Sequence, residues 1–477
     1  MKQSRVLGFI AGVFALMGVL WGVFPAEGVN VAGLNLRFPS YAGALKDASE
    51  VKVNVDSVIA GVNSRFRMEN DTLAFYRRFL YENPDRIYLP GDDYTFFDDF
   101  FREAEGAVRE GRTVRVMHYG DSQIELDRIS SDLRQTLQER FGGSGTGLFP
   151  ALSNVPSASV TKSASGAFVQ YTMYGDSTTV RAGHNRYGPM AQVVTVSGGG
   201  SMSIRATTSK TARPLVKSFS SVAVLYGRAS QNFSIKVSSD TLKPAVRTLS
   251  GESGTTWSVW TFPREVVRAG VRFTGSAELY GVATDSSAGI AVDNVPLRGC
   301  SGTIFTRISE PLMTESFDLL DTRLIILQFG GNYMPVIRND RVIAEYCEKI
   351  AAQIQYFHRV APKAKILFVG PSDMGKSYGG KIVTWPRLPQ LVDALRVTAL
   401  ENDAAFWDIF SMMGGENSMV RWVKHNPPYA GSDYIHFTPA GAKVVGETLA
   451  RSLMTCYDFY DLRKTVPPSR VKEAMKR

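Results

Sequence analysis

In the second half of the chain, short apolar runs alternate with amphipathic helical stretches, and this order limits the available folds more than any other feature. The pattern predicts strands at 324–329, 365–370 and 405–410 and helices at 341–360 and 388–400. Strands separated by helices are joined by crossovers, which make the strands parallel and place helices on both faces of the sheet. In such open sheets, ligands bind beyond the carboxyl ends of the strands. The sequence therefore predicts an α/β fold with its functional site at that edge.

An apolar strand nearer the N-terminus, Val114–Met117, runs into a Gly-Asp-Ser turn that ends at Ser122. A serine hydroxyl becomes a nucleophile when a rigid turn projects it towards a base supplied from elsewhere in the chain. Gly120 permits the tight backbone of such a turn. A helix expected from Leu126 to Phe141 would direct its first N–H groups at an oxyanion formed there. We therefore interpret Ser122 as the candidate nucleophile.

The candidate base lies near the other end of the chain, in a loop that contains Asp433 and His436. Thr438 is placed to cap a following helix, and Pro439 occupies its first position. A carboxylate in that loop holds the imidazole in one tautomer while the other ring nitrogen faces the serine. Of the five histidines, His436 alone has an acidic partner three residues before it. His118 lies within the first strand, where we expect it to be packed and hydrogen-bonded.

Two small-residue turns complete a recognisable pattern. One is Arg298–Gly302, and the other is Gly330–Asn332 at the end of a buried-looking strand. Together with the serine and histidine segments, they resemble the Ser, Gly, Asn and His blocks of the SGNH (GDSL-type) hydrolases. The stretch from His118 to Pro150 further resembles the peptidoglycan O-acetylesterases grouped with that family.

The resemblance implies a three-layer α/β/α SGNH-hydrolase fold around a parallel sheet. It also implies a catalytic triad of Ser122, His436 and Asp433. The implied oxyanion hole consists of the Ser122 N–H, the Gly302 N–H and the side-chain amide of Asn332.

A few neighbouring residues depart from that pattern or offer alternatives to it. Tyr333 follows the asparagine block, where the family often has an acidic residue, and Gly299 lies close to the glycine implied as a donor. Cys300 has no local histidine, so we expect it to pack beside the turn rather than act as a nucleophile. Asp373, at another strand end, is expected to bond its own backbone, with substrate contact as the alternative.

Residues 151–296 separate the serine block from the glycine block and are rich in Ser, Thr, Val and Gly. Period-two runs bounded by turn residues predict an antiparallel β-sandwich. The position makes it an insertion, and the peptidoglycan esterases that this chain resembles carry a jelly-roll-like insert there. A carbohydrate-binding role would depend on aromatic rings that stack on sugars, although aromatic residues in a sandwich are more often core. The candidate rings are those of Tyr226, Trp257, Trp260 and Tyr280.

The N-terminus differs in composition from the rest. Lys2 and Arg5 precede an uncharged apolar run from Val6 to Phe24, which is typical of an export signal or a membrane anchor. Bulky Phe24 lies where a cleavage site after Ala26 needs a small residue, which favours an uncleaved anchor over a removed peptide. Basic residues before the run would keep the N-terminus cytoplasmic and place the rest outside.

The remaining segments predict connecting structure. We expect a spacer and two short helices before residue 112, with their aromatic stripes in the core. We expect the glycine-rich stretch at 141–147 to be a flexible loop. We expect the second Gly-Asp-Ser turn at 175–177 to be a plain loop, and the basic C-terminus to be a solvated tail. The resulting organisation is a signal or anchor at 1–28, spacer and short helices at 29–112, hydrolase at 113–150 and 297–460, inserted β-sandwich at 151–296 and basic tail at 461–477.

Composition limits the partners of the chain. Its 477 residues suggest two or three domains, and its net charge of +9 favours anionic partners such as a membrane surface or a wall polymer. We find no nucleic-acid module. The three cysteines cannot all pair within one chain, so no disulfide framework is expected. Ser-His-Asp chemistry needs no metal, and we expect no cofactor.

These observations predict an exported serine esterase that removes O-acetyl groups from a cell-wall polysaccharide, with peptidoglycan as the expected substrate. The expected location is the periplasm or cell envelope, with membrane contact through the N-terminal segment. Two alternatives remain. An O-acetyltransferase would use the same residues to pass the acyl group to a glycan, and a non-catalytic glycan-binding envelope protein would bind without turnover.

Overall fold

The computed structural model describes residues 3–23, 25, 29–31, 34–36, 55–152, 155–175, 179–239, 242–248 and 254–476. The chain divides into two units, Met1–Thr72 and Leu73–Arg477. Most of the predicted spacer between residues 29 and 54 lies outside the described residues, as do Asp176 and Ser177 of the second Gly-Asp-Ser turn.

The first unit contains α1 (Gln3–Val23), β1 (Val29–Val31), β2 (Leu34–Leu36) and the start of α3 (Val55–Glu82). The two short strands pair antiparallel. Within the described ranges, no helix combines the length and the apolar character that a membrane crossing requires.

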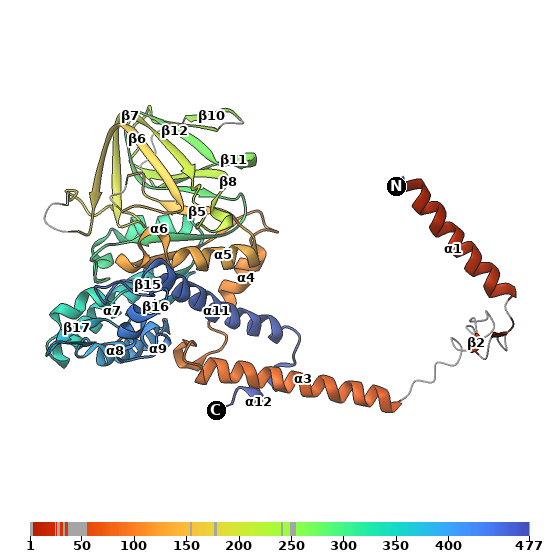
Figure 1. The fold of residues 1–477 in the computed structure, drawn as a ribbon. Coiled ribbons are helices and arrows are strands. Elements are labelled where there is room, and N and C mark those ends of the chain that lie inside the picture. The colour runs from red at the N-terminus through yellow and green to blue at the C-terminus, as the bar shows by residue number, and fades with distance from the viewer. Residues whose placement is uncertain are drawn as a thin grey trace. The chain divides into compact units, whose positions relative to one another are not determined.

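A six-stranded sheet forms the centre of the second unit (Figure 1). Its strands, in spatial order, are β14 (Gly289–Pro296), β4 (Thr113–Gly120), β15 (Thr322–Gln328), β16 (Lys365–Val369), β19 (Ala405–Trp407) and β3 (Ile87–Tyr88). The first five strands run parallel, as the alternation of strands and helices predicts. However, β3 pairs antiparallel with β19. The sheet is therefore mixed, because a strand from the predicted spacer region adds to its edge.

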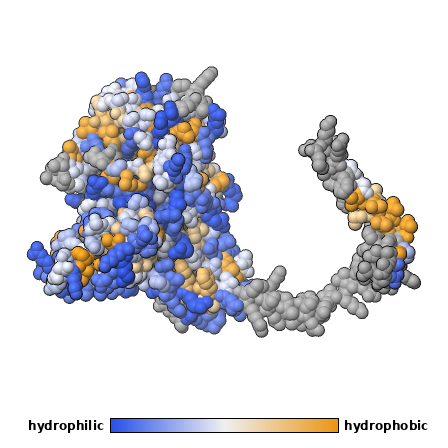
Figure 2. All heavy atoms as spheres, viewed as in Figure 1, coloured by the Kyte–Doolittle hydropathy of each residue, from blue (hydrophilic) through white to orange (hydrophobic). Residues whose placement is uncertain are grey.

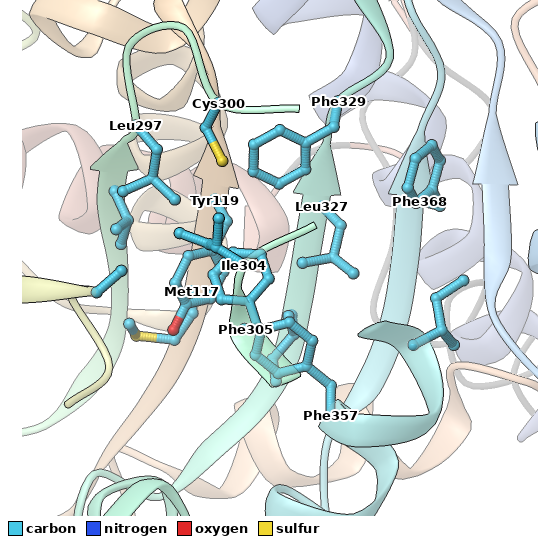
Figure 3. Close-up of a cluster of buried hydrophobic side chains, with 14 of the residues drawn as sticks. Met117, Tyr119, Leu297, Cys300, Ile304, Phe305, Leu327, Phe329, Phe357 and Phe368 are labelled. Atoms are coloured by element: carbon cyan, nitrogen blue, oxygen red, sulfur yellow. The ribbon is translucent and has the colours of Figure 1, made fainter. Parts of the chain in front are cut away.

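Side chains of these strands alternate between two buried cores, one on each face of the sheet. On β4, Val114 and Val116 belong to one core, and Met117 and Tyr119 belong to the other. The first core is covered by α4 (Asp98–Gly106), α5 (Ser130–Phe141) and α11 (Pro439–Arg463), and the second by α6 (Glu310–Leu319), α7 (Asp340–Val360) and α8 (Leu388–Glu401). Figure 3 shows part of the second core, where side chains from the strands meet Phe357 of α7. This part of the chain has three layers, helix, sheet and helix.

Strand β14 belongs to this sheet, although the sequence pattern placed its residues in the insertion. It pairs with β4 along its whole length, from Gly289 opposite Thr113 to Pro296 opposite Gly120. The α/β part, which the sequence predicted to resume at residue 297, therefore resumes at Gly289.

The glycine-rich stretch after α5 was expected to be a flexible loop, but it forms β5 (Gly145–Phe149), which pairs with β13 (Ala277–Asp285). Gly145 and Gly147 have φ values of 91° and 85°. A Cβ at Gly145 would collide with the carbonyl oxygen of Thr284. Glycine is needed here for close approach of two backbones, rather than for flexibility.

Between β5 and β14 the chain forms antiparallel strands, and with β5 they make one nine-stranded sheet, drawn mainly in yellow to green in Figure 1. Its other members are β6 (Val160–Thr172), β7 (Gln192–Ala206), β8 (Phe219–Gly227), β9 (Ser234–Ser239), β10 (Leu242–Thr248), β11 (Thr256–Val266), β12 (Arg268–Thr274) and β13. Inward-facing residues of these strands enclose a third hydrophobic core. On the face shown in Figure 2, apolar patches lie over this sheet, while hydrophilic residues predominate over the α/β part.

The remaining elements are short. They are the 3₁₀ helices η1 (Pro90–Asp92), η2 (Ser122–Asp127), η3 (Pro214–Val216), η4 (Phe305–Arg307) and η5 (Gly331–Val336), the hairpin strands β17 (Gly375–Tyr378) and β18 (Lys381–Thr384), and the helices α9 (Ile409–Met412), α10 (Ser418–Lys424) and α12 (Pro468–Ala474). The expected last strand, 405–410, ends at Trp407 because Asp408 caps α9 by accepting a hydrogen bond from the Ser411 N–H.

The two segments that flank the hydrolase part agree only partly with the sequence prediction. The aromatic stripe around α4 is core, as predicted, since Phe97, Phe100 and Phe101 are buried. In contrast, α3 is one long helix rather than a short one. The expected solvated tail is wrong, because α12 buries Val471 and the adjoining Met475 against the first core.

Buried charges join the two sheets. Arg115 of β4 forms ion pairs with Asp285 at the end of β13 and with Asp293 of β14. All three side chains are at most 5% exposed. Burial raises the pKa of Asp293 to about 6, against the attraction of the arginine. The arginine therefore compensates two carboxylates that would otherwise be isolated from water.

Replacing Arg115 with leucine is expected to lower the free energy of unfolding by about 3–5 kcal/mol, because two buried carboxylates lose their counter-charge. Urea denaturation at neutral pH measures this change. The matched control is Arg341→Leu, whose side chain is 86% exposed and should change stability by no more than about 0.5 kcal/mol. Equal effects of the two variants would contradict a structural role for the buried pair.

Candidate active site

A cavity of about 190 Å³ lies at the carboxyl ends of the parallel strands. This is the edge at which the sequence predicted the site. The turns after β4, β15 and β16 and the loop before α11 all contribute to it. Its lining residues include Asp121, Ser122, Gln123, Gln328, Asn332, Ser372, Met374, Trp385, Ile409 and His436.

The structure brings Ser122, His436 and Asp433 together in the order that a triad requires. Ser122 Oγ lies 2.9 Å from His436 Nε2. His436 Nδ1 lies 2.7 Å from Asp433 Oδ2. With the Nδ1 proton directed to the carboxylate, Nε2 is left to accept the serine proton.

Asp433 is held in its ionised form. Burial opposes the charge, but the His436 ring and the N–H groups of Ile435 and His436 donate hydrogen bonds to the carboxylate and keep the pKa of Asp433 below its usual value. The backbone bonds to Oδ1 measure 3.0 Å from Ile435 and 3.1 Å from His436. The loop therefore orients its own carboxylate before that carboxylate orients the imidazole. Thr438 caps α11 behind the loop, as predicted, by accepting a bond from the Gly441 N–H.

The turn that carries Ser122 differs from the predicted geometry. Asp121 caps the short helix η2 by accepting the Gln123 N–H at 2.9 Å. The chain then breaks at Leu126, which has a φ of 57°, and α5 starts only at Ser130. The N-terminus of α5 is therefore not directly behind the serine, and only the first N–H groups of η2 lie close to it.

Two residues that the sequence analysis did not single out join the serine turn to the histidine loop. The Gln123 side chain donates to the Ile435 carbonyl at 2.8 Å and accepts the Phe437 N–H at 3.2 Å. Arg128 donates to the Phe437 carbonyl at 3.0 Å and to the Ser122 carbonyl at 2.7 Å. The backbone on both sides of His436 is thus fixed to the turn. Both residues are near Ser122 in sequence, but their partners in the histidine loop lie about three hundred residues away, so no local pattern indicates that they join the two segments.

The two other predicted oxyanion donors differ in position. Asn332 lines the cavity, and its amide donates to Asp121 Oδ2 at 2.8 Å and to the Cys300 carbonyl at 3.3 Å. Gly302 is not among the residues that line the cavity, and its N–H donates to Cys300 Sγ at 3.3 Å. Its φ is 80°, and a Cβ at this position would collide with the Phe329 ring, so the turn needs glycine here.

The alternatives raised by the sequence have structural answers. Burial lowers the pKa of His118 to about 4, and the ring bonds Gln328 and Ser130, so it is the packed histidine that was predicted. Burial raises the pKa of Cys300 to about 11, which keeps the thiol neutral. Asp373 accepts the backbone N–H groups of Met374 and Met419 and does not line the cavity. Within the described residues, no group of three or more His, Cys, Asp and Glu side chains is arranged to hold a metal ion.

Three of the four aromatic residues considered for sugar stacking are core residues. Tyr226, Trp260 and Tyr280 are at most 4% exposed. Trp257 is partly buried and lies over the Arg115 guanidinium. None of the three buried rings is available to stack on a sugar.

Comparisons with known proteins agree with this architecture. Residues 269–444 match the model of the GDSL-like Lipase/Acylhydrolase family. This range includes the glycine, asparagine and histidine blocks but not Ser122, which lies on the other side of the inserted strands. No curated protein sequence matches the chain.

Among solved structures, one described as "Peptidoglycan O-acetylesterase in action" is 20% identical, with a TM-score of 0.60, over 79% of this chain and 98% of that one. A family two carbohydrate esterase from Cellvibrio japonicus is 12% identical, with a TM-score of 0.25, over 63% of this chain and 99% of its own. An acetyl xylan esterase is 14% identical, with a TM-score of 0.27, over 34% and 81%. The last two scores are too low to bear on the fold.

The matched domain and the fold define a carboxylic ester hydrolase. More particularly, residues 269–444 are similar to the GDSL-like lipases and acylhydrolases, and the fold of the chain resembles that of a peptidoglycan O-acetylesterase.

The buried carboxyl of Asp121 predicts a pH-dependent contribution to stability. Burial raises its pKa to about 6 from 3.8, so the folded chain binds this proton more tightly than the unfolded chain does. The stability that this proton provides is complete at low pH and is lost as the pH rises from about 4 to about 6. From pH 5 to pH 8 the wild type loses this stability, whereas Asp121→Asn has no carboxyl proton at this position to lose. The free energy of unfolding of the variant minus that of the wild type should therefore rise by about 1 kcal/mol between these two pH values.

Urea denaturation of both proteins at pH 5 and pH 8 measures this shift. The matched control is Asp393→Asn, since Asp393 has a side chain that is 72% exposed and should show no such shift. A constant difference between Asp121→Asn and the wild type at both pH values would contradict the raised pKa.

Proposed function

We propose that the protein is an exported esterase that removes O-acetyl groups from a cell-wall polysaccharide, most directly peptidoglycan, with Ser122 as nucleophile. The observation that carries the proposal is the chain of contacts from Ser122 Oγ through His436 to Asp433 inside the cavity. Each member comes from the segment that resembles the corresponding SGNH block. A hydroxyl, an imidazole and a carboxylate in this order perform acyl transfer through an acyl-enzyme.

The proposed reaction has two halves. In the first, His436 Nε2 takes the Ser122 proton while Oγ attacks the acetyl carbonyl carbon, and the tetrahedral intermediate collapses when the same proton passes to the departing sugar oxygen. In the second, His436 takes a proton from water, and the hydroxide attacks the acetyl group on Ser122. The serine regains its proton from His436, and acetate leaves. Asp433 stays ionised and stabilises the imidazolium that forms in each half.

The proposed oxyanion donors are the Ser122 N–H, the Gly302 N–H and the Asn332 amide. Asn332 already lies in the cavity, where its amide donates to Asp121 at 2.8 Å and to the Cys300 carbonyl at 3.3 Å. The longer bond, to Cys300, is the one expected to give way to the oxyanion. The Gly302 N–H faces a thiol sulfur, which is a weak acceptor. An oxyanion is a much stronger acceptor, so the bond to sulfur is expected to give way when charge develops on the substrate.

Support for the substrate comes from two sources. The solved structure with a TM-score of 0.60 is described as a peptidoglycan O-acetylesterase, and the net charge of +9 suits an anionic wall polymer. The proposed export to the periplasm or cell envelope, with an N-terminal membrane anchor, rests on the basic residues and apolar run at the N-terminus. Fractionation of cells, with the protein recovered outside the cytoplasm, tests the location.

We further propose that the inserted strands form a jelly-roll-like domain that helps to orient the glycan. In support, β7 pairs with β6, β12 and β13, and β13 pairs with β5, β7 and β8. Two long strands with three partners each allow the sheet to fold around its own core. Any glycan contact would involve surface residues, because three of the aromatic rings first considered are buried.

Substitution of Ser122 with alanine is expected to abolish acetate release from O-acetylated peptidoglycan, because the acyl-enzyme cannot form. Acetate is measured directly, with an aryl acetate as a second substrate. His436→Ala should have the same effect, and the matched control Ser131→Ala removes a nearby hydroxyl that bonds the Arg128 carbonyl.

Retained turnover in Ser122→Ala would contradict the proposal. Cleavage of the aryl acetate without release from peptidoglycan would keep the esterase and reject the wall substrate. Transfer of acetyl groups to a glycan in excess of acetate release would favour the O-acetyltransferase.

Asn332→Ala is expected to lower kcat by about a hundred- to a thousandfold, because one oxyanion donor is lost. KM should change little, since the donor acts on charge that develops after binding. Steady-state kinetics with the aryl acetate separate the two parameters. A rise in KM at constant kcat would instead assign Asn332 to substrate binding.

A further inference from the structure

The hairpin β17–β18 stands beside the cavity and pairs with no other strand among the described residues. Its two strands meet at Gly379–Gly380, both with positive φ, and extend about 13 Å from base to tip. None of the hairpin residues is buried, and Tyr378 at the tip is 75% exposed. A two-stranded hairpin with no buried side chains gains little stability from its own folding. A role in binding would explain why the chain forms it.

One face of this hairpin carries two lysines and a tyrosine beside Val383. Lys376 and Tyr378 share that face because they are two residues apart. The strand register places Lys381 opposite Tyr378, which adds a second ammonium group to the same face. Trp385 follows the second strand, and the Lys376 ammonium lies 4.7 Å from its ring centroid. From base to tip, the face therefore presents the Trp385 indole, then Lys376 opposite Val383, and then Tyr378 opposite Lys381.

Trp385 connects this face to the chemistry. It lines the cavity that holds Ser122 and His436, and it also lines a second pocket of about 170 Å³ with Thr384, Arg387, Gln390 and Asn417. Its indole is only partly buried, and it is shared by two neighbouring hollows. A tryptophan that is only partly buried is suited to stack on a sugar ring.

The base of the hairpin is fixed to the histidine loop. The Gly375 N–H donates to the Tyr434 carbonyl at 2.7 Å, between Asp433 and His436 in sequence. The backbone N–H of Trp385 donates to the Met374 carbonyl at 2.8 Å and closes the base of the hairpin. A Cβ at Gly375 would contact Tyr434 at 2.7 Å. A polymer bound along the hairpin would therefore be held in a defined position relative to His436.

One carboxylate, Glu416, lines the second pocket together with Trp385, but neither lysine of this face forms an ion pair with it. Within the described residues, no carboxylate lies within ion-pair distance of Lys376 or Lys381, whereas the neighbouring Arg387 is paired with Asp340. Two unpaired ammonium groups beside aromatic rings complement a carbohydrate that carries carboxylates.

We propose that Trp385, Lys376, Tyr378 and Lys381 form a binding strip for the glycan segment next to the acetylated sugar, and that this strip selects polymers bearing carboxylates. The inference rests on the proposed function, since it names the polymer that the esterase site would receive. Trp385 stacks on a sugar ring at the cavity, and the two lysines attract carboxylates farther along the chain.

The test compares one O-acetylated peptidoglycan preparation with the same material after amidation of its carboxylates. Wild-type KM should be lower for the charged polymer, and the difference should disappear in about 1 M salt. Lys376→Gln should raise KM for the charged polymer roughly two- to fivefold and have a smaller effect on the amidated polymer. Lys376→Arg keeps the charge and should restore the preference. Lys472→Gln on α12, well apart from the hairpin in Figure 1, is the charge-matched control.

Equal KM values of the wild type for the two polymers, or equal effects of Lys376→Gln and Lys472→Gln, would overturn the proposal. Hydrolysis of an aryl acetate is measured in parallel: if the wild type does not cleave it, the proposed function has failed, whereas normal cleavage without polymer selectivity rejects only the strip. Trp385→Ala should raise KM for both polymers, and Trp385→Phe should retain most of the affinity. Melting temperatures of all variants establish that each is folded.

Discussion

The ion pairs of Arg115 with Asp285 and Asp293 are the interaction on which the rest of the structure depends. They join β4, the strand that leads to Ser122, to the end of β13 in the inserted sheet and to β14, which pairs with β4. Buried charges contribute little net stability compared with apolar packing, but they penalise any arrangement that separates them. Their effect is therefore to fix the position at which the insertion rejoins the hydrolase sheet, and so to bring β14 into register with β4.

A second set of polar contacts acts at the other end of β4. Gln123 and Arg128 bond the backbone around His436, so the serine turn and the histidine loop move as one body. Preorganisation of this kind lowers the cost of aligning the groups when substrate binds. The apolar cores hold the strands, but it is these few hydrogen bonds that determine the separation of Ser122 from His436.

Much of the fold was predictable from the sequence, because strands and helices in alternation allow few arrangements. The pairing of Asp433 with His436 was predictable for the same kind of reason, since three residues in one loop leave little freedom. What failed involved contacts over long separations. Gln123 shows no local sign of its distant partners, and β5 contains glycines that suggest a loop until β13 is present beside it. The antiparallel edge strand β3 is only two residues long, too short to show a period.

The position of the insertion also affects the order in which the chain assembles. Every strand from β5 to β13 has its partners by residue 285, so the nine-stranded sheet is complete in sequence before most of the hydrolase sheet exists. Strand β4, by contrast, waits for β14 and β15, and loops of this length slow the pairing of strands. A nascent chain would therefore hold an unpaired, apolar β4 while the inserted sheet folds. The inserted sheet therefore has a kinetic consequence as well as a spatial one: it lengthens the time for which the strand leading to Ser122 has no neighbours.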